Sequence, residues 1–421
     1  MRARALGALA ALSLGAPALP APARAGDAER VRRAVAYTVE SQRPTGLFRY
    51  DFDVPSAEPT GGDNQVRQAG TLFALGEYLL EERDPRVEAA LRAGLESMAG
   101  LSLPISRGAA QRALEAVGVF RLSFGRVERQ LDRLGLLYAP EGDGLLVAEN
   151  GDYEKAQAGT TALALLAALE YEAATGDDRF ARARDGWTRG LLALHVEGAG
   201  IRMRPDTLET SPYFDGETWL AFAAHRGAFP DASEVEQALH ALEEALMERF
   251  GAAPSTHFFH WGAMASAQRY RTTKEARFAD FAARQAEWFL AAVPYERGRR
   301  HSTCSQIEGL ASAAAALAEH PEHEATLEKV RQRIGRELER NRRLQIAPGQ
   351  DRVALAAGGL LLAPVLAEHA GAFLAGPYHA YIRTDLNQHC ISAFLKARRI
   401  GLTDDAPPMG ESASRTAAGA P

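Results

Sequence analysis

The sequence is poor in several features that would each point to a particular class of protein. It has only two cysteines among 421 residues, which excludes a disulfide-rich scaffold and a metal site built from four cysteines. It has no excess of positive charge, because 48 Lys and Arg face 54 Asp and Glu and give a formal net charge of -6. A chain of this charge does not attract nucleic acid as a whole. We therefore expect no nucleic-acid partner.

Long apolar runs are also missing. Beyond residue 25, no stretch reaches the roughly 18 consecutive apolar residues that a bilayer-spanning helix needs. Residues 1–25 have a basic start with Arg2 and Arg4, a short apolar centre and the small-residue ending "ARA", which is typical of a secretory signal peptide. We expect a protein without a membrane span that is periplasmic or secreted. An uncleaved N-terminal anchor is the alternative.

Strand-like alternation is scarce, and apolar residues recur at helical spacing along most of the chain. Helices of one kind carry many charges, and we expect them over 27–42, 85–100, 178–194, 232–249, 274–292 and 323–341. Helices of a second kind are rich in Ala, Gly and Leu, and we expect them over 65–81, 157–174, 214–225, 258–270, 303–319 and 385–397. The two kinds alternate strictly. This order predicts an all-α fold, the (α/α)6 toroid, in which amphipathic outer helices wrap fully buried inner ones.

Two segments interrupt the alternation of charged and apolar helices, and a third segment follows the last helix. Segment 103–150 resembles extra helices followed by a short hairpin within 136–156, and segment 343–384 is similarly irregular. We expect both to be small insertions in a single toroid domain over residues 26–403. Residues 404–421 are rich in Pro, Ala, Ser and Gly without periodicity, which predicts a disordered tail.

The word Gln-Ala-Gly-Thr occurs twice, at 68–71 and at 157–160. Each copy lies early in an expected inner helix. Gly70 and Gly159 cost about 1 kcal/mol each in a helix interior. Close packing of neighbouring inner helices is a sufficient reason for them, so we assign them no chemistry.

All inner helices of such a toroid begin at the same rim, so the loops that enter them converge there. These loops are rich in polar and aromatic residues, and they are 48–67, 149–157, 208–219, 255–262, 299–309 and 380–390. This convergence predicts a cleft at the rim. Aromatic rings beside carboxylates, amides and arginines suit a sugar. The candidate substrate-binding residues are Arg67, Tyr213, Trp219, His260, Trp261, Asn387 and His389. The two tryptophans could stack on sugar rings, although plain core packing explains them equally well.

Acidic residues at the rim are candidates for catalysis. A glycosidase uses two carboxylates about 5–9.5 Å apart, depending on its mechanism, and the candidates here are Glu217, Glu308 and Asp385. Glu217 and Glu308 each fall inside an apolar helix, where burial raises the pKa of a carboxyl group and suits a general acid. In a six-fold ring Glu217 faces Asp385, and Glu154 faces Glu308, and the sequence does not choose between these pairs. Bonds to neighbouring helix N-termini are the alternative role for the two glutamates.

The two cysteines, Cys304 and Cys390, open inner helices that are neighbours in the ring. This position and the signal peptide predict a disulfide between them. Zinc held by Cys304, His389 and Cys390 is one alternative, and two free thiols are the other. We expect the disulfide, and neither a metal nor another cofactor.

Several stretches resemble a known group of proteins. They are "NQVRQAGTLFAL", "PYFDGETWLAF", "HFFHWGAMASA", "CSQIEGLASA" and "RTDLNQHCISAFL". Over about residues 30–400 the chain resembles the (α/α)-toroid group, which includes the six-hairpin glycosidases and the helical domain of glucuronyl C5-epimerases. The resemblance implies the architecture more than the reaction. In composition, "HC" at 389–390 is loosely similar to the zinc ligands of the lanthionine cyclase toroids, but their Gly-flanked Cys-His pair is absent.

These observations lead to three hypotheses about function. The first is an exported carbohydrate-active enzyme, a glycoside hydrolase that acts on a poly- or oligosaccharide at the rim. The second is a polysaccharide lyase or uronate epimerase, in which Tyr213, His260, Arg67 and Arg383 supply acid–base chemistry. The third is a non-catalytic glycan-binding or envelope scaffold protein. The sequence indicates no partner protein.

Overall fold

The computed structural model describes residues 26–105, 143–149, 152–296, 301–355 and 358–404. The predicted signal peptide, nearly all of the predicted tail and residues 106–142 of the first insertion lie outside these residues. Within them, no helix is long and apolar enough to cross a bilayer.

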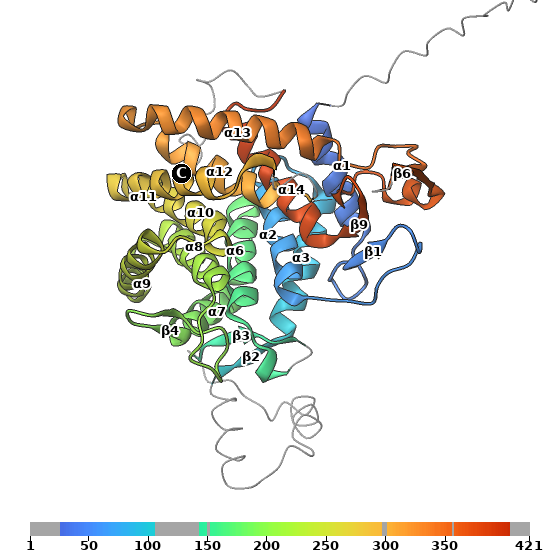
Figure 1. Ribbon diagram of the computed structural model, residues 1–421. Helices are drawn as coiled ribbons and strands as arrows, with labels where there is room; N and C mark the ends of the chain where they lie inside the picture. Colours follow the sequence, from blue (N-terminus) through green and yellow to red (C-terminus); the bar gives the residue numbers. More distant parts are fainter. Residues whose placement is uncertain (1–25, 106–142, 150–151, 297–300, 356–357, 405–421) are drawn as a thin grey trace, which may run out of the picture.

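Twelve long helices in the described residues form two layers (Figure 1). The outer helices are α1 (Asp27–Glu40), α3 (Pro85–Gly100), α7 (Ala181–Leu194), α9 (Ser233–Ala252), α11 (Ala276–Ala292) and α13 (Glu324–Arg342). The inner helices are α2 (Gln65–Leu79), α6 (Ala158–Thr175), α8 (Pro212–Ala228), α10 (Thr256–Thr273), α12 (Cys304–Leu317) and α14 (Thr384–Arg399). Each predicted helix has its counterpart within a few residues. The predicted all-α (α/α)6 toroid is confirmed.

The inner helices close into a ring. In chain order each packs against the next, from α2 through α6, α8, α10 and α12 to α14, and α14 packs against α2. This order places α2 opposite α10 and α8 opposite α14. The sequence shows the reason for the two layers: α6 is buried continuously over 158–169, whereas α13 buries a stripe that includes Leu327, Val330, Ile334 and Leu338. A stripe at this spacing covers one face of a helix.

Glycines allow the inner helices to approach closely, as the Gln-Ala-Gly-Thr repeat predicted. The space that a Cβ would take at Gly70 of α2 is filled by the side chain of Gln388 from α14. At Gly159 of α6, the same space is filled by the carboxyl group of Glu217 and the ring of Phe214, both from α8. The repeat therefore does more than bring two backbones together, since each glycine receives a side chain from the adjacent helix.

Short strands decorate the ring and tie distant segments together. The strands β1 (Asp51–Asp53), β9 (His379–Arg383) and β8 (Leu374–Gly376) form one antiparallel sheet in that order. Two-stranded pairs join β2 (Ser102–Pro104) to β3 (Leu145–Val147), β4 (His195–Val196) to β5 (Gly200–Ile201), and β6 (Arg352–Ala354) to β7 (Leu360–Leu362). The hairpin predicted within 136–156 is found only in part: β3 pairs with residues 102–104, Ala148 forms an isolated antiparallel bridge with Ala156, and residues 136–142 and 150–151 lie outside the described residues. Three short 3₁₀ helices complete the description: η2 (Tyr153–Lys155), η4 (Pro321–His323) and η5 (Pro364–His369).

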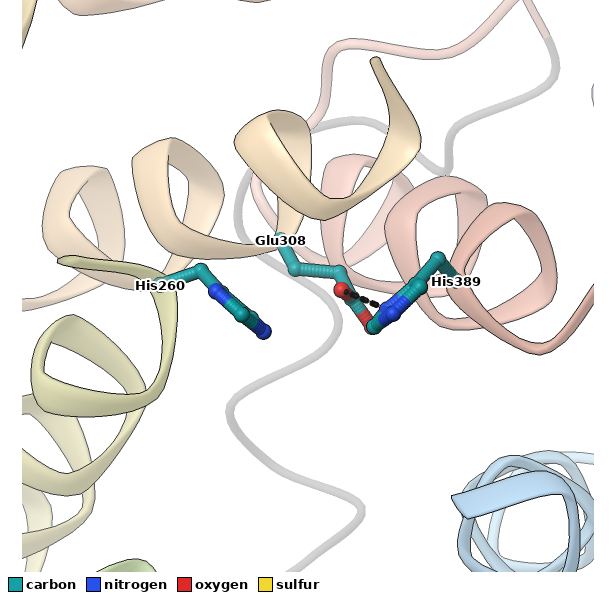
Figure 2. Close-up of side chains that lie close together, drawn as sticks. All are labelled: His260, Glu308 and His389. Carbon is teal, nitrogen blue, oxygen red and sulfur yellow. Dashed lines mark hydrogen bonds and ion pairs between the residues drawn. The ribbon is translucent and has the colours of Figure 1, made fainter. Parts of the chain in front are cut away.

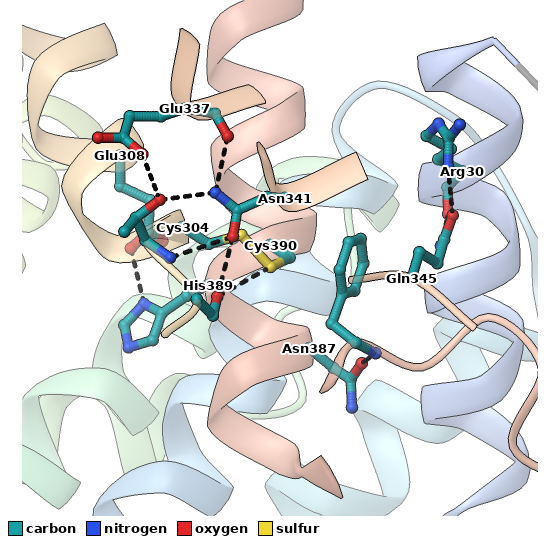
Figure 3. Close-up of a disulfide and its surroundings, with 12 residues drawn as sticks. Arg30, Cys304, Glu308, Glu337, Asn341, Gln345, Asn387, His389 and Cys390 are labelled. Atoms are coloured by element: carbon teal, nitrogen blue, oxygen red, sulfur yellow. Dashed lines mark hydrogen bonds and ion pairs between the residues drawn. A yellow bond between two sulfur atoms is a disulfide. The ribbon is translucent and has the colours of Figure 1, made fainter. Parts of the chain in front are cut away.

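The predicted disulfide is confirmed. Cys304 in the first turn of α12 is bonded to Cys390 of α14, with a Cα–Cα distance of 4.8 Å (Figure 3). Because both sulfurs are in this bond, the alternative zinc site that used the two thiols is excluded.

Candidate functional site

The first two turns of the inner helices come together at one end of the ring, and we call this region the N-terminal rim. Arg67 of α2 forms an ion pair with Asp385 of α14, at an N–O distance of 3.1 Å. Tyr213 of α8 stacks on His257 of α10, with ring centroids 4.9 Å apart. These contacts confirm that helices far apart in the sequence begin on the same side of the toroid.

Glu308 and His389 form a hydrogen-bonded pair at the N-terminal rim. Glu308 in the second turn of α12 is 1% exposed, and its Oε2 lies 2.6 Å from Nδ1 of His389 (Figures 2 and 3). Glu308 follows Cys304 by one turn and His389 directly precedes Cys390, so the disulfide holds the two helices together where this bond forms. Burial by itself lowers the pKa of His389, but the charge and hydrogen bond of Glu308 outweigh it and raise that pKa above the ordinary histidine value.

His260 is the neighbour of this pair and has the opposite electrostatic environment. Its ring centroid lies 5.6 Å from that of His389, and the two rings come from α10 and α14 (Figure 2). Gly309 makes this approach of α10 to α12 possible, because a Cβ there would lie 2.8 Å from the His260 Cα. Burial, together with the charge of His389, lowers the pKa of His260 well below the ordinary value. Its Nε2 is buried without a hydrogen-bond partner among the described residues.

The two histidines are therefore suited to opposite roles. A raised pKa favours the protonated form of a histidine, which can donate a proton, and a lowered pKa favours the neutral form, whose lone pair can accept one. Neighbouring groups whose pKa values are pushed apart are the mark of an acid–base pair.

Glu217 is a buried carboxyl group without a partner. Its Oε2 has no hydrogen bond among the described residues, and it lies against Gly159 of α6. Burial alone raises its pKa well above the ordinary value, which favours the neutral form of the group. The sequence-based interpretation of Glu217 as a buried acid agrees with this environment. The alternative, a hydrogen bond from Glu217 to the N-terminus of a neighbouring helix, is not found among the described residues.

Asp385 lies at the rim but is held by two arginines. Its carboxylate accepts hydrogen bonds from Nε of Arg383 at 2.5 Å and from Nη2 of the same residue at 2.9 Å. Arg67 adds the ion pair described above, and its Nη1 also bonds the hydroxyl of Tyr50. Through these contacts Asp385 fixes the positions of the Arg383 and Arg67 side chains. The ring order places α8 opposite α14, as predicted for Glu217 and Asp385, but the arginines leave Asp385 poorly suited to act as a base.

The two candidate tryptophans have different surroundings. Trp219 is 0% exposed and packs between the rings of Phe258 and Phe281. It is a core residue, and a sugar cannot reach it to stack on it. Trp261 is also buried, but its ring lies 4.6 Å from that of His260 and 6.4 Å from that of His389. Trp261 therefore packs directly beneath the acid–base pair.

The remaining candidates lie at the edge of the site. Tyr213 is 40% exposed, and its ring also approaches the edge of His260 at 6.5 Å. Asn387 is buried, and its Oδ1 accepts a hydrogen bond from the backbone N–H of Phe373, so it anchors the strand region before α14. A cavity of about 520 Å³ lies beside the rim, and Tyr50 and Thr384 contribute to its wall. Residues from two of the six loops that were predicted to form a cleft, 48–67 and 380–390, line this cavity.

Sequence reasoning missed two residues at this end of the ring. Phe73 of α2 crosses the ring to meet Trp261 of α10 at a centroid distance of 6.3 Å. Gln388 fills the space at Gly70, and its Oε1 is buried without a partner among the described residues. A phenylalanine in an apolar helix gives no signal that distinguishes it, whereas the glycine of the repeat could have indicated a neighbouring side chain.

His260, Glu308 and His389 are also the described residues closest to a metal-binding arrangement. Their potential ligand atoms lie within 4.8 Å of one another, whereas the ligands of a tetrahedral zinc at about 2.0–2.1 Å are closer together than that. A metal would also displace the proton between Glu308 and His389. The arrangement fits proton transfer better than it fits a metal ion.

Comparisons by sequence find nothing similar: no protein-family model matches the chain, and no curated protein does. Comparison by structure gives a different result. A glycoside hydrolase family 76 α-1,6-mannanase from Salegentibacter sp. superposes with a TM-score of 0.57 at 12% identity, covering 88% of this chain and 98% of its own. The chain has the six-hairpin glycosidase-like (α/α)6 toroid fold. The resemblance inferred from the sequence is confirmed at the level of the fold.

Two further neighbours carry out different reactions on the same scaffold. An unsaturated glucuronyl hydrolase specific for heparin has a TM-score of 0.55 at 10% identity, over 89% of this chain and 97% of its own. A D-mannose isomerase has a TM-score of 0.55 at 10% identity, over 88% and 97%. A variant of the mannanase, described as inactive, has alanine in place of two consecutive aspartates and is bound to α-1,6-mannotetrose. The fold is therefore shared by hydrolases and an isomerase.

Proposed function

We propose that this protein is an exported carbohydrate-active enzyme that transfers protons on a sugar or uronate at the N-terminal rim, as an epimerase, isomerase or lyase does. One observation carries the proposal: two histidine rings 5.6 Å apart have pKa values shifted in opposite directions. The sugar neighbours of the same fold support the substrate class, and the predicted signal peptide supports export.

The roles of the pair follow from their contacts. We assign the role of base to neutral His260, whose unpartnered Nε2 accepts a proton from a carbon next to the carbonyl or carboxylate of the sugar. This atom is buried, so the sugar has to reach it past the partly exposed His389. His389 is protonated at both ring nitrogens and donates Nδ1–H to Glu308, so its Nε2–H is left to protonate the substrate. The guanidinium of Arg67, held by Asp385, is partly exposed and offers a charged donor to a uronate carboxylate.

Hydrolysis is the second candidate because of Glu217. A neutral, buried carboxyl group is suited to protonate a glycosidic oxygen. Its base would have to come from Glu308 or Asp385, and each of these is engaged by a cationic side chain. The consecutive aspartates changed in the inactive mannanase also lack a counterpart at the rim, since Asp177 and Asp178 follow the opposite end of α6. For these two reasons we rank hydrolysis second to proton transfer.

Incubation in heavy water separates the two reactions. Purified protein is mixed with a panel of reducing sugars, uronates and envelope or plant polysaccharides in D₂O, and proton NMR follows each substrate. Proton transfer replaces a C–H by C–D, whereas hydrolysis produces new reducing ends without that exchange. An unsaturated uronate that absorbs in the ultraviolet identifies the lyase form of the reaction.

Matched variants connect the reaction to the site. His389→Gln and His260→Gln should each abolish the exchange, while His240→Gln on outer helix α9 should leave it unchanged. Exchange at the wild-type rate in either rim variant contradicts the proposal. Glycan binding without turnover of any substrate in the panel supports the non-catalytic alternative.

A further inference from the structure

A large cavity lies at the end of the ring opposite the acid–base site. Its volume is about 570 Å³, within the range of about 300–1,000 Å³ that is common for small-molecule sites. The last turns of all six inner helices surround it, through residues such as Leu80, Ala173, Ala228, Thr272, Ala316 and Arg399. We call it the C-terminal cavity.

The C-terminal cavity is separated from the N-terminal rim. Phe73 lines the cavity, and its ring meets that of Trp261 from the opposite helix. Trp261 in turn packs on His260. This aromatic pair crosses the middle of the ring, so a molecule in the cavity does not reach the acid–base pair.

Most charges around the cavity are neutralised within the protein. Lys396 pairs with buried Glu77, and Lys274 pairs with Glu319 at 2.9 Å. Arg399 donates to Glu81 at 2.7 Å. These three cations therefore give no net attraction to a ligand.

Two groups in the wall of the cavity, Glu170 and Arg271, have no ion-pair partner among the described residues, although the charge of each acts on the other. The Oε2 atom of Glu170 is buried and has no hydrogen-bond partner among the described residues. It occupies the space left by Gly76 of the adjacent helix α2. Arg271 donates to Gln268 at 2.5 Å, and no described carboxylate lies within ion-pair distance of it. One buried acid and one arginine are thus left for a ligand.

The two groups differ in charge at neutral pH. Burial, reinforced by the nearby Glu77 carboxylate, raises the pKa of Glu170 well above the ordinary value. Burial therefore favours the uncharged, hydrogen-bond-donating form of Glu170 against the opposing charges of Lys396, Arg399 and Arg271, whereas Arg271 is cationic. The cavity combines one uncompensated positive charge, one neutral donor and walls that are mainly apolar, including Leu166, Leu220 and Met264.

We propose that the C-terminal cavity binds a small carboxylate with an apolar body, whose carboxylate lies between Arg271 and Glu170 while its apolar part packs in the cavity. The carboxylate would take a charged hydrogen bond from the guanidinium and a neutral one from the carboxyl group. The inference goes beyond the proposed function and does not depend on it, because binding is measured without any turnover.

Calorimetry with three probes of equal chain length tests the charge preference. Octanoate, octanol and octylamine differ only in their head group. We expect octanoate to bind at least tenfold more tightly than octanol, and octylamine to bind more weakly than both. Tighter binding of octylamine would show that Glu170 receives a cation and would overturn the proposal, as would no binding of octanoate.

Variants then locate the probe. Arg271→Gln should weaken octanoate at least tenfold, and Glu170→Leu should also weaken it. Glu170→Gln keeps a neutral donor and should bind within a few-fold of wild type. Arg86→Gln, an exposed arginine on outer helix α3, is the matched control and should have no effect. Thermal unfolding shows that each variant is folded, and equal octanoate affinity in folded Arg271→Gln protein contradicts the proposed site.

Discussion

The two ends of the inner ring use polar residues in different ways. At the C-terminal end, Lys396, Lys274 and Arg399 each have a carboxylate partner. At the N-terminal rim, buried polar atoms are left without partners among the described residues: Gln65 Oε1, Glu217 Oε2, His260 Nε2, Gln306 Oε1 and Gln388 Oε1. Paired groups stabilise a fold, whereas an unpaired buried group lowers stability and is kept where a ligand completes its bonds.

The difference has a physical cause in the direction of the helices. Helix N-termini concentrate free N–H groups and positive potential, whereas C-termini concentrate free carbonyls and negative potential. Basic side chains at the C-terminal end, such as Lys396 and Arg399 in the last turn of α14, match that potential. The N-terminal rim instead holds Glu217, His260 and His389, whose pKa values are shifted from their ordinary values. Glu170 and His225 are exceptions at the C-terminal end, since each has a buried polar atom without a partner among the described residues, and Glu170 is the one that lines the cavity.

The largest expected effect lies at the rim. His389→Gln removes the proton donor and should lower turnover of the substrate by about 10²–10⁴-fold, the usual contribution of one acid–base group. Stability should fall as well, because buried Glu308 loses its cationic partner and keeps at most a neutral hydrogen bond from the glutamine, so turnover is compared in folded protein. Steady-state kinetics of the heavy-water exchange measures this effect. Unchanged turnover would show that His389 is not a catalytic group, and the N-terminal rim would then not differ from the C-terminal end in function.

The opposite result is expected for the paired end. Lys396→Met leaves Glu77 buried without its cation, and removal of one partner of a buried pair costs about 3–5 kcal/mol of unfolding free energy. Denaturant unfolding measures that cost. The folded fraction should retain most of its turnover, because Lys396 bonds Glu77 and lies over Phe73, and its charge is only a minor cause of the lowered pKa of His260. Loss of turnover in folded protein would show that the two ends act as one site.

Removal of the disulfide tests how the rim is held together. Cys304 and Cys390 are 86 residues apart in sequence, and loss of such a bridge typically costs about 2–5 kcal/mol. The double variant Cys304→Ala/Cys390→Ala should therefore unfold at lower denaturant concentration. It should also lower turnover, since the bridge lies beside both Glu308 and His389. Calorimetric unfolding and kinetics at a temperature where the variant stays folded separate the two effects.

The smallest effect concerns the unpartnered acid. The pKa of Glu217 is raised in the folded protein, so the unfolded chain loses this proton first as pH increases. Stability of the wild type should therefore fall above the ordinary glutamate pKa of about 4.3, by up to about 1.4 kcal/mol per pH unit. Glu217→Gln should remove that dependence and be the more stable protein at pH 7. Parallel stability–pH curves for the two proteins would contradict the assignment of Glu217 as a neutral acid.

Much of the fold could be predicted because its signal is local. The alternation of charged and apolar helices follows from the residues in each helix, and small residues such as Gly70 and Gly159 indicate close packing. The sheet could not be predicted, because β1 and β9 are more than 300 residues apart and their pairing of Asp51 with Arg383 depends on ring closure.

The site was predicted only in part, for a related reason. The converging loops placed His260, Glu308 and His389 at one rim, since chain direction alone fixes which helix ends meet. The bond between Glu308 and His389 depends on the rotation of α12 against α14, which no periodicity specifies. Trp219 shows the same limit, because the sequence cannot tell which face of α8 is directed to the outer helices.

The protonation states of the two histidines test the central claim most directly. Nitrogen NMR of ¹⁵N-histidine-labelled protein, assigned with the His260→Gln and His389→Gln variants, gives each titration curve. The account predicts that His389 stays protonated above the ordinary histidine pKa of about 6.5, that His260 stays neutral well below it, and that Glu308→Gln lowers the pKa of His389. Two histidines that titrate together near the ordinary value would contradict the account.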